Sequence, residues 1–204
     1  MLSLYTQFRA EAFKSSVLTE IEKDELIAAV NAGRLYKRSM VLHTQGAQNK
    51  GSKLEHLIEY FLVSAYYNGK EALETSLHAL KDFLMKEGKE NLEIKDQYTS
   101  LLEVLNQIKE WTEDYDQSFL PKVITGVSNG EELRNLVFED GQVKSSKEYL
   151  AYVGMFITEL DGPNAKEAFA MARKNGVSDA EFAELGYVII FTAGIPSWFE
   201  MSDN

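Results

Sequence analysis

The sequence contains no cysteine, and this absence alone excludes several classes of protein. Without thiols the chain has no disulfide framework, no thiolate metal site and no cysteine-based redox chemistry. A cytoplasmic location is the default for a chain of this kind. Histidine is also scarce, and the three dispersed histidines provide no set of ligands with metal-binding spacing. We therefore expect no metal site and no cofactor.

Long apolar runs and a surplus of positive charge are also absent. No run of about 18 apolar residues occurs, so the sequence predicts no membrane span. Charged residues follow closely on the first residues, at Arg9, Glu11 and Lys14, which does not fit a secretory signal. The net charge of −11 disfavours nucleic acid and anionic membranes as partners, because no broad surface that neutralises phosphates can form.

The composition that remains is that of a globular helical protein. Of 204 residues, 45% are apolar and 26% charged, and only three are proline. A chain of this length can bury a substantial core. We therefore predict an all-α fold, with an N-terminal helical region over residues 1–120 and a second region over residues 121–204, packed as one compact unit. The boundary is placed where the acidic and aromatic segment 113–121 interrupts the helical periodicity.

Apolar spacing and capping signals predict where the helices lie. The expected helices cover residues 2–15, 19–33, 54–68, 73–88 and 94–108, with a short one over 132–137 and further ones from 145, 162 and 178. Capping boxes are expected at Thr19–Glu22, Ser145–Glu148 and Ser178–Glu181. Residues 67–72 echo residues 160–168 too briefly to establish an internal duplication.

Residues 34–53 form a basic island in an otherwise acidic chain. They include five Lys or Arg residues and no acidic residue. Two interpretations remain open: a binding surface for an anionic ligand or for an acidic sister subunit, and a solvated loop around Gly46 and Gly51. The solvated loop is the preferred interpretation.

The stretch 158–198 carries the most informative motifs. Gly162 and Pro163 suit a helix start, and Gly176 suits its end. The next helix is apolar on nearly all sides from Ala180 to Phe191, and Pro196 prevents its continuation.

The motifs NGVS at 175–178 and AGIP at 193–196 resemble the end of the core repeat of the carboxymuconolactone decarboxylase and alkylhydroperoxidase D (AhpD-like) superfamily. The resemblance covers roughly residues 146–198 and implies an AhpD-like helical bundle. It places the family's Cys-x-x-Cys pair and histidine at Asp161, Asn164 and Ala168, so the family's redox chemistry is lost. The family's glutamate on the preceding helix has Glu148 as its nearest candidate. The resemblance also implies a homo-oligomer, a trimer or a hexamer.

Two functions follow as hypotheses. The first is a redox-inactive AhpD-like protein that binds a small organic molecule or transforms it without a cofactor. Its candidate site residues are Asp161, Asn164, Glu148 and Tyr152. The second is a non-enzymatic helical oligomer that serves as a scaffold for protein interactions.

Each candidate residue also has a purely structural interpretation. Asp161 suits an N-cap, Asn164 a surface position in the first turn, Glu148 the closing residue of a capping box, and Tyr152 a core position. A separate hypothesis pairs His56 with Glu59, three residues later on the same helix, as a base and its orienting acid. A solvated polar stripe explains that pair equally well.

Overall fold

The computed structural model describes residues 2–116 and 119–197, and these residues form nine α-helices and one 3-10 helix with no strand. The helices are α1 (Leu2–Ala12), α2 (Glu20–Gly33), α3 (Lys37–Asn49), α4 (Leu54–Lys86), α5 (Leu101–Trp111), α6 (Leu120–Ser128), η1 (Leu133–Asn135), α7 (Ser145–Thr158), α8 (Gly162–Lys174) and α9 (Asp179–Ala193). The all-α prediction is confirmed. None of the described helices combines the length and the apolar character that a membrane span requires.

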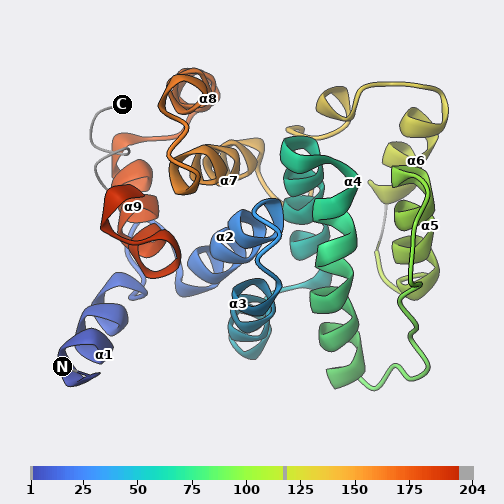
Figure 1. Ribbon diagram of the computed structural model, residues 1–204, viewed down its shortest axis with the longest axis horizontal. Helices are drawn as coiled ribbons and strands as arrows, with labels where there is room; N and C mark the ends of the chain where they lie inside the picture. The colour runs from blue at the N-terminus through green and yellow to red at the C-terminus, as the bar shows by residue number, and fades with distance from the viewer. Residues whose placement is uncertain (1, 117–118, 198–204) are drawn as a thin grey trace.

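Helix α2 lies at the centre of the molecule, with α1 and α9 at one end and α5 and α6 at the other (Figure 1). Every residue of α2 from Lys23 to Gly33 is buried. Two apolar clusters meet on this helix. Ile27 and Val30 join the cluster built with α7 and α9, whereas Ala28 and Ala32 join the cluster built with α4 and α5. The core therefore contains residues from both sides of residue 120.

The buried charges of α2 all have partners. The carboxylate of Asp24 lies 2.7 Å from His43 Nδ1 and 2.5 Å from Lys50 Nζ. The next residue, Glu25, accepts a hydrogen bond of 2.5 Å from the Ser52 hydroxyl. Because buried ions are tolerated when they are paired and hydrogen-bonded, these contacts fix how α3 and α4 dock on α2.

The described residues contain two equivalent three-helix units, here called the two halves. Helices α2 and α3 and the first part of α4 recur as α7, α8 and α9, and each begins 125 residues later, at Glu20 and Ser145, Lys37 and Gly162, and Leu54 and Asp179. Three pairs of residues with positive φ share this spacing: Leu35 and Leu160 at 58° each, Gly51 at 94° and Gly176 at 90°, and Gly69 at 70° and Gly194 at 83°.

The two halves pack crosswise. Helix α4 contacts α7, and its equivalent α9 contacts α2. Where α2 and α7 meet, Lys147 Nζ lies 3.1 Å from Glu22 Oε1, and these two residues occupy the same position in the two halves. The sequence echo between 67–72 and 160–168 therefore has the wrong register. The true equivalents of Asn68 and Gly69 are Ala193 and Gly194, at the end of α9.

Several local predictions are confirmed. The capping boxes at Thr19–Glu22 and Ser178–Glu181 are present. Helix α4 is interrupted at Asn68 and Gly69, as expected, although helical hydrogen bonding resumes at once. The short helix expected over 132–137 is the single 3-10 turn of η1.

Other predictions are wrong. The basic island is not a loop, because residues 37–49 form α3. Helix α5 begins only at Leu101, where Ser100 caps it, so Ile94 and Tyr98 precede the helix. The third capping box is absent, because Lys144 is the N-cap of α7 and makes no side-chain cap.

Candidate functional site: a buried carboxyl pair

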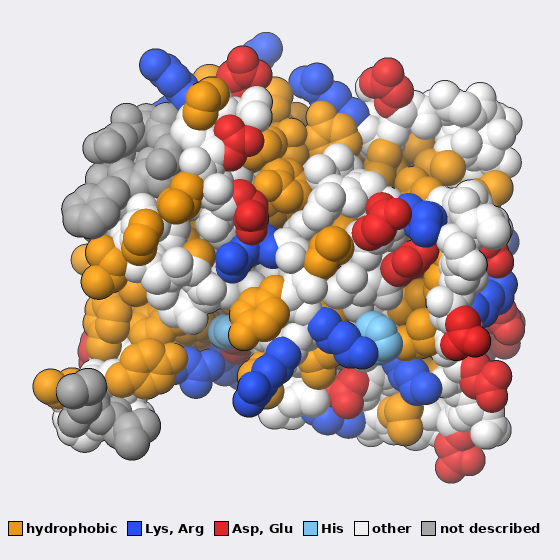
Figure 2. Space-filling model, in the orientation of Figure 1, with side chains coloured by type: hydrophobic (Ala, Val, Ile, Leu, Met, Phe, Trp, Pro, Cys, Tyr) orange, Lys and Arg blue, Asp and Glu red, His pale blue; other side chains and the backbone are white. Residues whose placement is uncertain are grey.

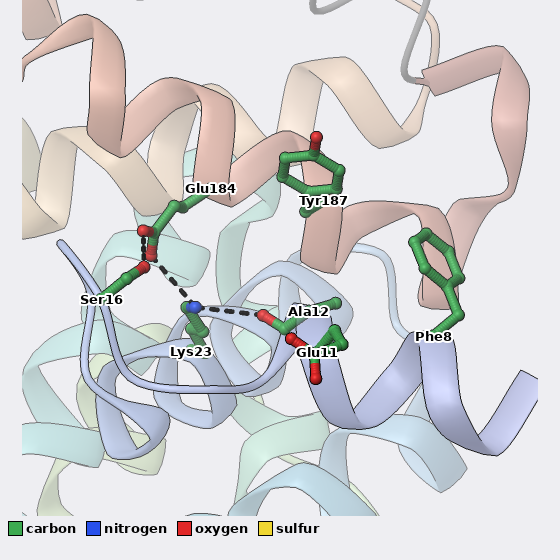
Figure 3. Close-up of a pocket in the computed structure, with 7 residues that line it drawn as sticks. All are labelled: Phe8, Glu11, Ala12, Ser16, Lys23, Glu184 and Tyr187. Atoms are coloured by element: carbon green, nitrogen blue, oxygen red, sulfur yellow. Dashed lines mark hydrogen bonds and ion pairs between the residues drawn. The ribbon is translucent and has the colours of Figure 1, made fainter.

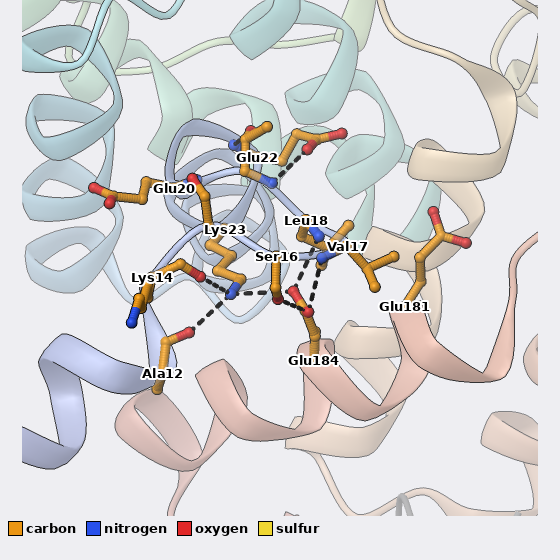
Figure 4. A network of polar contacts seen from close by, with 12 residues as sticks. Ala12, Lys14, Ser16, Val17, Leu18, Glu20, Glu22, Lys23, Glu181 and Glu184 are labelled. Atoms are coloured by element: carbon orange, nitrogen blue, oxygen red, sulfur yellow. Dashed lines mark hydrogen bonds and ion pairs between the residues drawn. The ribbon is translucent and has the colours of Figure 1, made fainter.

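Two equivalent glutamates anchor two equivalent loops. On α4, the Glu59 carboxylate accepts hydrogen bonds from the backbone N–H groups of Gln142, at 2.9 Å, and Val143, at 2.7 Å. On α9, the Glu184 carboxylate accepts hydrogen bonds of 3.0 Å from the backbone N–H groups of residues 17 and 18 (Figure 4). Each glutamate thus holds the loop that precedes the first helix of the other half.

The residue that faces the glutamate differs between the halves. In one half it is Lys23 on α2, whose Nζ lies 3.1 Å from Glu184 Oε2 (Figure 4). The same Nζ donates to the carbonyl oxygens of Ala12, at 3.0 Å, and Lys14, at 2.6 Å. In the other half the equivalent position, on α7, carries Glu148. The Lys23–Glu184 ion pair, whose ammonium contacts three oxygen atoms, therefore corresponds in the second half to the two carboxyl groups of Glu148 and Glu59.

These two carboxyl groups line one cavity of about 200 Å³, here called the Glu59–Glu148 cavity. Its other lining residues come from α4, from α6 and its N-cap, and from the segment between η1 and α7: Leu62, Phe119, Lys122, Leu136, Val137, Glu139, Asp140 and Gly141. Glu148 is only 3% exposed, yet among the described residues its Oε2 has no hydrogen-bond partner. An orphaned polar atom at this depth is costly unless it meets a ligand or carries a proton.

The environment favours the protonated form of Glu148. Burial, followed by the negative charge of Glu59, raises the pKa of Glu148 to about 9, although the backbone N–H of Phe138 opposes the shift. Burial also raises the pKa of Glu59, against the amides of Gln142 and Val143. Glu184 differs, because the amides of Leu18 and Val17 and the ammonium of Lys23 outweigh burial and lower its pKa.

This arrangement has a defined chemical capacity. Near neutral pH, Glu148 presents an O–H donor to the cavity while Glu59 keeps an acceptor there. A pair of carboxyl groups whose environments differ in this way can serve as a general acid and a general base. The described residues hold no group of three or more His, Cys, Asp or Glu side chains placed to bind a metal ion.

Of the four residues predicted for the site, the structure places Glu148 in the cavity. Tyr152 lies one turn further along α7, half-buried in an aromatic cluster with ring centroids 5.3 Å from Tyr66 and 5.6 Å from Phe138. Burial, together with the neighbouring Tyr66 hydroxyl, raises the pKa of Tyr152, so this phenol stays neutral. The backbone N–H of Phe138 donates a hydrogen bond to Glu148. Tyr152 therefore supports the cavity only indirectly, through its contact with the Phe138 ring.

Asp161 and Asn164 lie at the other end of α7. The Asp161 side chain caps α8 by accepting from the Asn164 backbone N–H, at 3.4 Å, and from the Asn164 side-chain amide, at 2.7 Å. Asn164 is exposed. From Glu148 to its last residue, Thr158, α7 rises about 15 Å at 1.5 Å per residue, and Asp161 and Asn164 lie beyond that end. The four predicted residues therefore do not converge on one cavity.

The proposed pairing of His56 with Glu59 is wrong. His56 Nδ1 lies 3.3 Å from Glu25 Oε1, and this hydrogen bond raises the pKa of His56. Glu59 points instead to the loop at Gln142. Glu59 was missed as the partner of Glu148 because 89 positions separate them in the sequence. One signal was present: Glu59 is a single acidic residue in the apolar run from Leu57 to Leu62.

A second cavity, of about 310 Å³, lies beside the Lys23–Glu184 ion pair between α1 and α9 (Figure 3). Phe8, Ala12 and Tyr187 contribute most of its apolar wall. Because Lys23 already has three oxygen partners, this cavity presents no unpartnered polar group from the ion pair.

No protein-family model matches the sequence, and no curated protein matches it.

Proposed function

We propose that this protein binds a small polar organic molecule in the Glu59–Glu148 cavity and moves a proton to or from it without a cofactor. The observation that carries the proposal is the unpartnered Oε2 of Glu148, which is buried in a cavity that also holds a second carboxyl group. On this view Glu148 donates the proton and Glu59, oriented by two backbone amides, accepts one.

A redox-inactive AhpD-like origin remains part of the proposal. It is supported by the NGVS and AGIP motifs and by an all-α architecture with a repeated three-helix unit. The cavity differs from the site that the resemblance implied, because it uses Glu148 but neither Asp161 nor Asn164.

The proposal can be tested by measuring the protonation of the two carboxyl groups and their response to ligands. Protein labelled with ¹³C at the glutamate carboxyl carbons would be titrated from pH 4 to 10 by NMR and then screened with small polar molecules. We expect one glutamate to titrate near pH 9, and a ligand to shift the same signal and that of Glu59. Glu148→Gln should abolish both effects, whereas Glu167→Gln on the exposed face of α8 should change neither. A Glu148 signal that titrates near pH 4.5 and ignores every molecule would overturn the proposal.

The second candidate function is a scaffold formed by self-association through α1 and α9. Four large side chains of these helices remain exposed: Leu4 at 69%, Tyr5 at 53%, Phe8 at 43% and Tyr187 at 46%. Apolar side chains gather on this side of the molecule in Figure 2. Exposed apolar patches often mark interaction sites. Light scattering after size exclusion should show an oligomer that Tyr187→Glu dissociates and the control Leu42→Glu, on α3, leaves intact. A monomer at all concentrations contradicts this candidate.

A further inference from the structure

The equivalence of the two halves identifies what the Glu59–Glu148 cavity lacks. In the first half, an ammonium group lies between the anchoring carboxylate and two backbone carbonyl oxygens, and Lys23 supplies it. In the second half, the anchoring carboxylate has the same two amide donors, but no described side chain supplies an ammonium to it. Glu148 stands where Lys23 would stand, and its side chain is shorter by one atom.

The residues around this position match as well. The carbonyl partners of Lys23 belong to Ala12 and Lys14, and the residues 125 positions later are Val137 and Glu139. Both of these residues line the Glu59–Glu148 cavity. The cavity therefore corresponds to the cavity beside the Lys23–Glu184 ion pair, since six residues that line each of the two are 125 positions apart. In that equivalent cavity the ammonium of Lys23 forms part of the wall, whereas here Glu148 does.

The charges around the cavity favour a cation. The groups that face Glu148 are Glu59 and Tyr60 from α4, Lys122 from α6, Glu139 and Asp140 from the segment before α7, and Tyr149 from α7 itself. Only Lys122 is basic, and its ammonium is paired with Glu139. A cationic ligand would thus allow Glu148 to ionise beside Glu59, because its positive charge attracts both carboxylates.

We infer that the Glu59–Glu148 cavity binds the primary ammonium group of a small amine, which takes the place that the Lys23 ammonium holds in the other half. A primary ammonium has three N–H donors, enough to reach both carboxylates and one further oxygen. Because Glu148 must be ionised in the complex, its proton leaves to solvent when the ammonium enters. The balance is one ammonium bound and one proton released per site. This inference rests on the ligand-binding part of the proposed function and names the ligand class; with an ammonium bound, Glu148 acts as an anionic acceptor and not as the proton donor.

Three probes separate ammonium recognition from weaker alternatives. Propylammonium chloride carries charge and N–H donors, 1-propanol has nearly the same shape without charge, and tetramethylammonium chloride has charge without N–H donors. Binding would be followed by NMR on glutamate carboxyl carbons at pH 6, 7 and 8. We expect propylammonium alone to shift the Glu59 and Glu148 signals, with affinity rising about tenfold per pH unit because one proton is displaced.

Two variants sharpen the test. Glu148→Gln should weaken propylammonium binding by about tenfold or more and remove its pH dependence, because one charged acceptor is lost. Glu148→Lys should rebuild the ion pair of the first half, abolish amine binding and raise the melting temperature. Glu167→Gln is the control and should bind like the original protein.

The outcomes distinguish this inference from the proposed function. If 1-propanol binds as well as propylammonium, or tetramethylammonium binds equally, recognition of a primary ammonium is wrong while the cavity remains a ligand site. If no probe binds but Glu148 titrates near pH 9, the amine inference is again overturned and the proton-transfer proposal survives. If Glu148 titrates near pH 4.5 and nothing binds, both are wrong.

Discussion

Glu22 and Lys147 are equivalent residues of the two halves that also contact each other, with Lys147 Nζ 3.1 Å from Glu22 Oε1. Equivalent residues can meet only where the two halves cross, so this pair marks the centre of the internal symmetry. Lys147 also lies 2.8 Å from Glu181 Oε1, the closing residue of the α9 capping box. The contact therefore joins α2, α7 and α9.

Removing the Lys147 ammonium should destabilise this junction. Because both carboxylates are partly buried, Lys147→Met should lower the free energy of unfolding by about 1–2 kcal/mol. Glu22→Gln should cost less in that background than in the original protein, and urea unfolding of the double-mutant cycle measures the difference. The exposed Lys144→Met is the control. Full additivity of the two substitutions would show that the pair is not coupled.

The protonated Glu148 makes stability depend on pH in the alkaline direction. Its pKa of about 9 in the folded protein lies above its ordinary value of 4.5, so between these values the folded state holds a proton that the unfolded state has released. Unfolding free energy should therefore fall as pH rises through this interval, by up to about 1.4 kcal/mol per pH unit. Glu148→Gln should remove most of this slope. A slope that is identical in both proteins would rule out Glu148 as its source.

Gly141 should tolerate no side chain while Glu59 is in place. A Cβ at Gly141 would lie 2.5 Å from Glu59 Oε1, and that oxygen is held by the Gln142 amide. Gly141→Ala should cost about 1–3 kcal/mol, because overpacking displaces the carboxylate from its donors. The same substitution made in a Glu59→Ala protein should cost little, and thermal unfolding of the four proteins checks this. An equal cost in both backgrounds would place the strain elsewhere.

The leucines that begin the turns before α3 and α8 should be replaceable with a gain in stability. Leu35 and Leu160 each have a φ of 58°, and both side chains are about half exposed, at 44% and 51%. Left-handed backbone is unfavourable for leucine and better tolerated by asparagine. Leu160→Asn should therefore raise the unfolding free energy by about 0.5–1 kcal/mol. Asparagine at Leu42, which lies inside helix α3, should not stabilise, and a loss at Leu160 would contradict the argument.

Local features of the fold were predictable from the sequence, and long-range ones were not. The capping boxes at Thr19 and Ser178 depend on residues three apart, so pattern was sufficient. The sequence does not predict α3, because Gly46 and its polar neighbours weaken the apolar periodicity of a helix. This helix docks on α2 through the Asp24–His43 contact, which local sequence does not reveal. The repeat escaped notice because few identities survive between the halves, and the equivalence lies in φ angles and helix boundaries instead.

The same limit applies to the site. Glu148 was selected, but its better-supported sequence interpretation was the closing residue of a capping box. Its burial opposite Glu59 depends on the crossing of α4 and α7, which no local pattern encodes. The family resemblance alone assigns Asp161 and Asn164 to the site. In the structure the two side chains are hydrogen-bonded to each other at the start of α8.

The two halves exchange loop contacts in the way that the two subunits of a symmetric dimer do. Each half contributes the loop that the other half's glutamate holds, so neither half can complete its own anchoring without the other. In a true homodimer, any change at one such site appears at both. Fusion into one chain removes that constraint. The Lys23 copy keeps its ion pair and joins the two halves, whereas the Glu148 copy carries a second carboxyl group at the equivalent position.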